Sequence, residues 1–171
     1  LDGRAQLNIT AFDIEWKGIQ IGVSNPACGC SYLDNGGDAF SRGFEVEGSL
    51  QPLAGLSINY NLTYTKAQLT STIPGAPPFI LSPYQLPGVP KWTGGVTADY
   101  SWAVGGDWNA SIGGGVHFVG EEINGPVYDP LYQPNTKNPG YATGDLRAGL
   151  DNGKLNISLF VHNVTDERVY L

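Results

Sequence analysis

Strict alternation of apolar and polar side chains is the feature of this chain that most limits what it can fold into. Between residues 56 and 65, Ser, Thr and Asn alternate with five apolar residues: Leu56, Ile58, Tyr60, Leu62 and Tyr64. Residues two apart share one face of a β-strand, whereas an α-helix would scatter them around its circumference. The segment is therefore predicted to be a strand with one apolar and one polar face.

The same alternation recurs along the chain, at residues 44–51, 92–102, 108–118, 145–150 and 155–162. The first segment, residues 4–23, alternates less cleanly. Its apolar phase shifts at Ala11–Phe12 and again near Lys17–Gly18, so we expect a β-bulge at each point. Together these segments predict an all-β fold of about seven long strands.

The connections between these segments alternate between two lengths. The short ones are residues 52–55, 103–107 and 151–153, and the last contains Asn152-Gly153, a signal for a tight hairpin. The long ones are residues 24–38, 71–87 and 122–139, rich in Pro, Gly, Asn and Asp. Regular alternation predicts an antiparallel up-and-down meander, with every short turn at one end and every long loop at the other.

The polar faces decide between a soluble and a membrane architecture. They carry mainly Ser, Thr, Asn and Gly, whereas the outer face of a soluble β-sandwich is charged. Strands of about 10–14 residues exceed the globular mode of about 5–6 and suit a tilted membrane crossing. Aromatic residues near the strand ends resemble the girdles of outer-membrane barrels: Trp92, Tyr100, Trp102, Trp108, Phe118 and Tyr141. We therefore predict part of a transmembrane β-barrel.

Two other architectures remain open, a secreted β-sandwich binding module and a small closed outer-membrane barrel acting as a pore or an enzyme. Seven strands leave two bare edges, and each unpaired backbone group in hydrocarbon costs several kcal/mol. We therefore expect residues 1–171 to be one segment of a larger barrel, cut from a longer chain.

Charge and motifs limit the function. The chain has 16 acidic and nine basic residues, and the bases are scattered singly along it. This argues against a nucleic-acid partner and against electrostatic docking on anionic lipid. The motif Cys28-Gly29-Cys30 is a poor zinc signature, so we expect a loop disulfide or two free thiols. Neither phosphate-binding nor hydrolytic motifs occur, and we expect no enzyme activity, metal or cofactor.

Four stretches of the sequence resemble the C-terminal β-barrel of TonB-dependent outer-membrane receptors: residues 12–21 (FDIEWKGIQI), 36–69 (GGDAFSRGFEVEGSLQPLAGLSINYNLTYTKAQL), 86–92 (LPGVPKW) and 155–171 (LNISLFVHNVTDERVYL). Residues 42–47 and 163–166 are the more specific pieces. The resemblance implies a 22-strand barrel, closed by an N-terminal plug, in the outer membrane of a Gram-negative bacterium. It further implies uptake of a scarce small-molecule ligand, commonly an iron–siderophore chelate and sometimes cobalamin or an oligosaccharide, driven by a TonB complex. The plug, the TonB-contact segment and the final strand have no counterpart in these 171 residues, as expected of a fragment.

Candidate site residues follow from this arrangement. The long loops would form part of an extracellular vestibule, where three tyrosines could stack on a flat ligand or pack within the loops: Tyr84, Tyr128 and Tyr132. The polar faces would line the lumen, with seven residues of interest: Glu45, Glu47, Asp99, His117, Asp145, Arg147 and His162.

Each lumen candidate has alternative interpretations. Glu45 and Glu47 lie roughly 7 Å apart on one face and could act as the catalytic carboxylate pair of a glycosidase. The favoured interpretation is that they are solvated lumen charges that contact the plug. Asp145 and Arg147 share a face and could form an ion pair. His117 and His162 could bind a metal or relay protons, although hydrogen-bonded lumen histidines are favoured.

Overall fold

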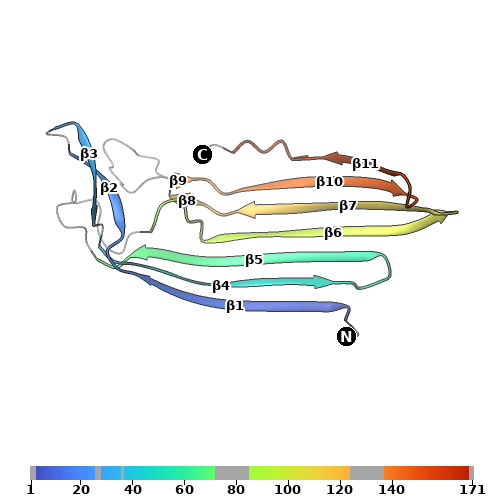
Figure 1. The fold of residues 1–171 in the computed structure, drawn as a ribbon, viewed down its shortest axis with the longest axis horizontal. Helices are drawn as coiled ribbons and strands as arrows, with labels where there is room; N and C mark the ends of the chain where they lie inside the picture. Colours follow the sequence, from blue (N-terminus) through green and yellow to red (C-terminus); the bar gives the residue numbers. More distant parts are fainter. Residues whose placement is uncertain (1–2, 26–27, 36, 72–84, 124–136, 170–171) are drawn as a thin grey trace.

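A computed structural model describes residues 3–25, 28–35, 37–71, 85–123 and 137–169. Seven antiparallel strands form one sheet in the order β1-β4-β5-β6-β7-β10-β11 (Figure 1). Their bounds are β1 Ala5–Trp16, β4 Ala39–Leu50, β5 Leu56–Leu69, β6 Trp92–Gly105, β7 Trp108–Val119, β10 Tyr141–Asp151 and β11 Asn156–Val161. The predicted all-β meander of seven long strands is confirmed. Within the described ranges, no helix is long and apolar enough to cross a membrane.

Two small hairpins lie in the long connections. The segment 24–38, expected to be a loop, forms most of a hairpin of β2 (Gln20–Asn25) and β3 (Cys30–Asn35) beyond the long-loop end of the sheet (Figure 1). A disulfide joins Cys28 to Cys30 at its turn, which bears out the disulfide alternative and not the free thiols. The second hairpin pairs β8 (Glu122–Ile123) with β9 (Lys137–Asn138).

The two bulges expected in the first segment are absent from the described strand. Residues 5–16 of β1 pair with β4 in one unbroken register, so the expectation of a bulge at Ala11–Phe12 is wrong. The faces of β1 exchange polarity there instead, because Leu7, Ile9 and Asp13 share one face in a regular strand. Near Lys17–Gly18 the strand ends, and Gly18 (φ 62°) turns the chain out of the sheet.

The cross-strand register gives the sheet two contrasting faces. We define the apolar face by its central residues: Leu7, Ile9, Val46, Leu62, Val96, Ile112, Val116, Leu146 and Leu159. The polar face carries the alternate residues, among them Asn8, Glu47, Asn61, Thr97, His117, Arg147 and Ser158. Over the middle of the sheet both faces continue across all seven strands, because each register there pairs apolar positions with apolar positions; the exchange on β1 begins only at Phe12.

The apolar face is uncovered. In the described part of the chain, the buried hydrophobic residues are Ala39, Ala67, Leu69 and Ala110, and no large side chain is fully buried. On the apolar face, Ile9 is 67% exposed and Leu159 is 73% exposed. A β-sandwich would pack such side chains against a second sheet, so the single layer matches a barrel wall and not the sandwich alternative.

Aromatic clusters mark both ends of the apolar face. At the long-loop end the ring centroid of Tyr64 lies 5.7 Å from that of Phe44 and 4.7 Å from that of Trp92. At the short-turn end Tyr100 stacks on Trp102 at 5.5 Å. The ten residue-to-residue steps from Trp92 to Trp102 span about 33 Å of strand, or roughly 25 Å in height at a tilt of about 40°. This height matches the lipid-facing band of an outer-membrane barrel.

Candidate functional site on the polar face

The structure places the seven lumen candidates on the polar face, on four strands and just beyond the end of β11. Four of them line one hollow of about 520 Å³ over the middle of the sheet: Glu47, His117, Asp145 and Arg147. The sequence interpretation missed the amides that share this hollow, among them Asn8, Asn59 and Asn61. Asn8 Nδ2 donates to Glu47 Oε1 at 3.1 Å. These amides occupy polar positions of the period-two alternation, so the alternation in the sequence could have identified them.

One ion pair crosses three strands of this face. Arg147 on β10 donates from Nε to Asp99 Oδ1 on β6 at 2.7 Å, and its Nη2 contacts the other carboxylate oxygen. The pair passes over Gly113 of β7, where a Cβ atom would overlap the Asp99 carboxylate. Glycine therefore leaves the room that the bidentate contact needs. The Asp145–Arg147 ion pair that the sequence left possible does not form, because Asp99 on β6 binds the guanidinium across β7.

We predict that this ion pair contributes little to stability. The side chains of Arg147 and Asp99 are 48% and 38% exposed, and water screens pairs of this kind, so the coupling energy should be about 0–1 kcal/mol. A double-mutant cycle of D99A, R147A and the double variant, measured by denaturant unfolding of the complete protein in lipid vesicles, tests this. A coupling energy above roughly 2 kcal/mol would contradict the prediction and indicate a site shielded from water.

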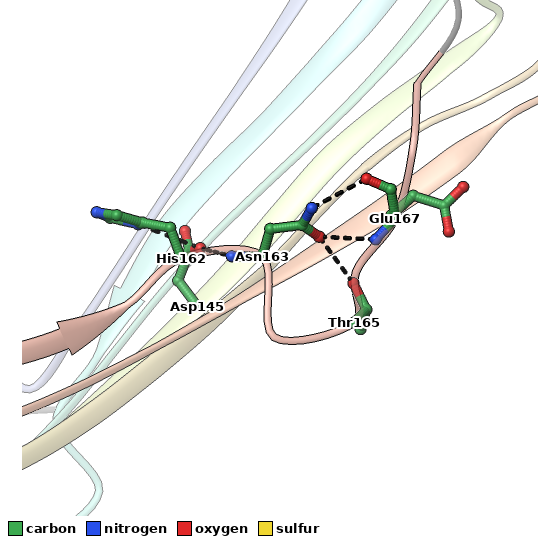
Figure 2. A network of polar contacts seen from close by, with 5 residues as sticks. All are labelled: Asp145, His162, Asn163, Thr165 and Glu167. Carbon is green, nitrogen blue, oxygen red and sulfur yellow. Dashed lines mark hydrogen bonds and ion pairs between the residues drawn. The ribbon is translucent and has the colours of Figure 1, made fainter.

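A second polar network lies where β11 ends, and Figure 2 shows its five residues. The Asp145 carboxylate accepts the backbone N–H of Asn163 at 2.9 Å, and the same oxygen lies 3.3 Å from His162 Nδ1. His162 is 72% exposed, and its ring lies 5.1 Å from that of Phe160. Asp145 therefore joins the end of β11 to the middle of β10, in place of pairing with Arg147.

The Asn163 side chain organises the turn that follows. Its Oδ1 accepts from Thr165 Oγ1 at 3.1 Å and from the Glu167 N–H at 3.0 Å, while its Nδ2 donates to the Glu167 carbonyl at 2.9 Å (Figure 2). Asn163 adopts φ 51°, a left-handed conformation that asparagine tolerates better than most residues. The Val164 N–H donates to Gly144 O at 2.8 Å, so the turn packs beside β10.

The remaining candidates are not brought into a common site. Glu45 is exposed on the polar face, with neither an ion-pair nor a hydrogen-bond partner in the described ranges. It shares its face with Glu47 on β4, two residues away. Tyr84, Tyr128 and Tyr132 lie outside the described residues. The polar face thus presents amides, carboxylates and one bidentate ion pair, an arrangement suited to polar contacts with another surface.

A protein-family model described as TonB dependent receptor-like, beta-barrel matches residues 1–164. No curated protein sequence matches the chain.

Solved structures share the arrangement of strands. The ferric yersiniabactin uptake receptor FyuA from Yersinia pestis superposes with a TM-score of 0.75 at 21% identity, over 98% of this chain and 23% of that one. The siderophore receptor PiuA from Acinetobacter baumannii superposes with a TM-score of 0.74 at 19% identity, over 99% of this chain and 23% of that one. The ferripyoverdine receptor of Pseudomonas aeruginosa superposes with a TM-score of 0.69 at 20% identity, over 99% of this chain and 22% of that one. The chain therefore has the fold of these barrels and spans about a quarter of their length.

Proposed function

The chain belongs to the TonB-dependent receptor-like β-barrel family, and from that premise we propose that it forms seven adjacent wall strands of a receptor in the outer membrane of a Gram-negative bacterium. The receptor would take up a scarce small-molecule ligand with energy supplied by a TonB complex. The observation that supports this most directly is the continuous, uncovered apolar face of all seven strands. Such a face is stable against lipid and unstable against water.

The polar face supports a role in holding a plug domain in the lumen. Its hollow of about 520 Å³ is lined by amides and carboxylates that can form hydrogen bonds with another protein surface. Glu45 and Glu47 are exposed there, and only Glu47 has a polar partner in the described part of the chain, the Asn8 amide. Carboxylates so placed are suited to basic side chains of a plug.

An iron–siderophore chelate is the ligand class that we propose. The support is the printed description of several solved relatives as siderophore or ferric-chelate receptors. Tyr84, Tyr128 and Tyr132 remain our candidates for ligand contact. The expectation that the chain carries no enzyme activity also remains a prediction.

Uptake of labelled ferric chelates tests the proposal. The complete protein would be expressed in a Gram-negative host without ferric-chelate receptors of its own, supplied with a panel of ⁵⁵Fe-labelled siderophores. We expect accumulation of at least one chelate in cells with TonB, and background accumulation in otherwise identical cells without TonB.

Two results would contradict the proposal. Equal accumulation with and without TonB would indicate a passive pore. Recovery of the protein as a soluble monomer would indicate that the apolar face is covered in another way, as in the sandwich alternative.

A further inference from the structure

The apolar face ends abruptly at the long-loop end of the first strands. Ala11, Phe44, Tyr64 and Trp92 are register partners in one row across β1, β4, β5 and β6. The next row outward on the same face is Asp13, Arg42 and Lys66, and all three are exposed. The row after that is Glu15, Phe40 and Gln68. Charge therefore begins one row beyond the aromatic cluster, on the outer surface of the wall.

The side chains of this charged row form one cluster. Arg42 Nε donates to Asp13 Oδ1 at 2.7 Å, and Arg42 Nη2 lies 3.8 Å from Glu15 Oε1. The guanidinium carbon of Arg42 lies 4.6 Å from the ring centroid of Phe40, and Lys66 Nζ lies 5.8 Å from the same centroid. Two cations thus share one aromatic ring, at the reach expected of cation–π contacts.

The contacts of the two cations leave some of their N–H donors without a hydrogen-bond partner in the described part of the chain. Asp13 occupies Nε of Arg42, and the 3.8 Å separation from Glu15 is too long for a hydrogen bond. Lys66 has no carboxylate within ion-pair distance in the described part of the chain, so its ammonium keeps three donors available. Arg42 and Lys66, 24 residues apart in sequence, are direct cross-strand partners. Two of the bases that are scattered in the sequence are therefore brought side by side by the strand register.

We propose that Arg42 and Lys66 bind the phosphate group of a membrane lipid at the long-loop end of the barrel, an inference that rests on the proposed function. Charged side chains on a lipid-facing surface are tolerated near the interface and not in hydrocarbon, and the aromatic row marks that interface. Lipid phosphates lie at this depth. A guanidinium and an ammonium side by side are a favourable pair of donors for phosphate oxygens.

The charge balance of the cluster favours a lipid over a free phosphate ion. Two acids and two bases sum to no net charge, so the cluster exerts little long-range attraction on a dissolved anion. A lipid headgroup is delivered to this depth by its own acyl chains, which raises its effective concentration beside Arg42 and Lys66. Asp13 then acts to hold the guanidinium in place rather than to repel the ligand.

Lipid binding by the complete receptor, purified in detergent, tests this site by native mass spectrometry. The probes are dioleoyl phosphatidic acid and dioleoylglycerol, which have the same acyl chains and differ in the phosphate. We expect R42Q/K66Q to weaken binding of the tightest phosphatidic acid equivalent at least fivefold, with dioleoylglycerol binding weak and unchanged. R42K/K66R, which keeps both charges, should bind within about twofold of the wild type. K154Q, which removes an exposed lysine at the opposite end of the sheet, should bind as the wild type does.

The outcomes separate this inference from the proposed function. A receptor that inserts into membranes, but whose R42Q/K66Q variant binds phosphatidic acid as tightly as K154Q does, would overturn the phosphate site alone. Equal binding of the two probes by the wild type would also overturn it. A complete protein that does not insert into membranes at all would instead overturn the proposed function.

Discussion

Replacing Val96 with arginine should destabilise the complete receptor in lipid vesicles by about 2–4 kcal/mol, the cost of arginine near the middle of the bilayer on a lipid-facing strand. Val96 is 45% exposed on the apolar face. It lies on β6 between Trp92 and Trp102, the aromatic residues that bracket the band. Its register partners are Tyr60 and Val116 on the same face, so neither neighbour can neutralise a charge. Denaturant unfolding in vesicles measures the loss.

Thr97 supplies the matched control for this prediction. It is the next residue on the same strand, points to the polar face and lines the hollow there. T97R should cost about 1 kcal/mol or less, because an arginine in an aqueous lumen keeps its hydration. A larger loss of unfolding free energy for T97R than for V96R would show that the lipid-facing and lumen-facing sides have been assigned the wrong way round.

Asn163→Ala should destabilise the end of β11 by about 2–3 kcal/mol. The substitution removes the side-chain hydrogen bonds to Thr165 and Glu167, each contributing roughly 0.5–1.5 kcal/mol. It also places alanine at φ 51°, a left-handed conformation that alanine tolerates less well than asparagine, and this strain adds about 1 kcal/mol to the loss of stability. Hydrogen exchange at the Val164 amide, which donates to Gly144 O, measures the local opening directly.

Asn163→Gly separates the two causes. Glycine adopts the left-handed conformation without strain but restores none of the side-chain hydrogen bonds. We therefore expect its Val164 amide to exchange more slowly than that of N163A and faster than that of the wild type. Equal protection of the Val164 amide in all three proteins would show that the hydrogen bonds of Figure 2 do not stabilise the turn.

The fold was predictable because its main determinant is local. Period-two alternation within one segment assigns each residue to a face without knowledge of which strand lies beside it. The alternating lengths of the connections indicate that consecutive strands are antiparallel neighbours. The β2–β3 hairpin was not predicted, because residues 20–23 of β2 were assigned to the first segment and the turn-forming residues of 24–38 concealed the rest of β2 and all of β3. The polarity exchange at Ala11–Phe12 has the same sequence pattern as a bulge, since sequence alone cannot distinguish a slipped register from a point where the surroundings of a regular strand change.

The contacts of the site were less predictable, because they depend on which residues the register brings together. Residue spacing placed Asp145 and Arg147 on one face and suggested that they pair. The partner of Arg147 is Asp99, 48 residues away and two strands across the sheet. Arg42 and Lys66 are likewise neighbours through strand register alone. No pattern within one segment contains that information.

Site-directed spin labels at residues 96–101 of β6, in the complete receptor in lipid vesicles, test the central claim that one face of the sheet meets lipid and the other an aqueous lumen. The measured quantity is the accessibility of each label to oxygen, which concentrates in lipid, and to a water-soluble nickel chelate. We expect oxygen accessibility to be high at Val96, Ala98 and Tyr100, and the ratio of nickel to oxygen accessibility to rise at Thr97, Asp99 and Ser101. Accessibility that does not alternate, or that alternates in the opposite phase, would contradict the account.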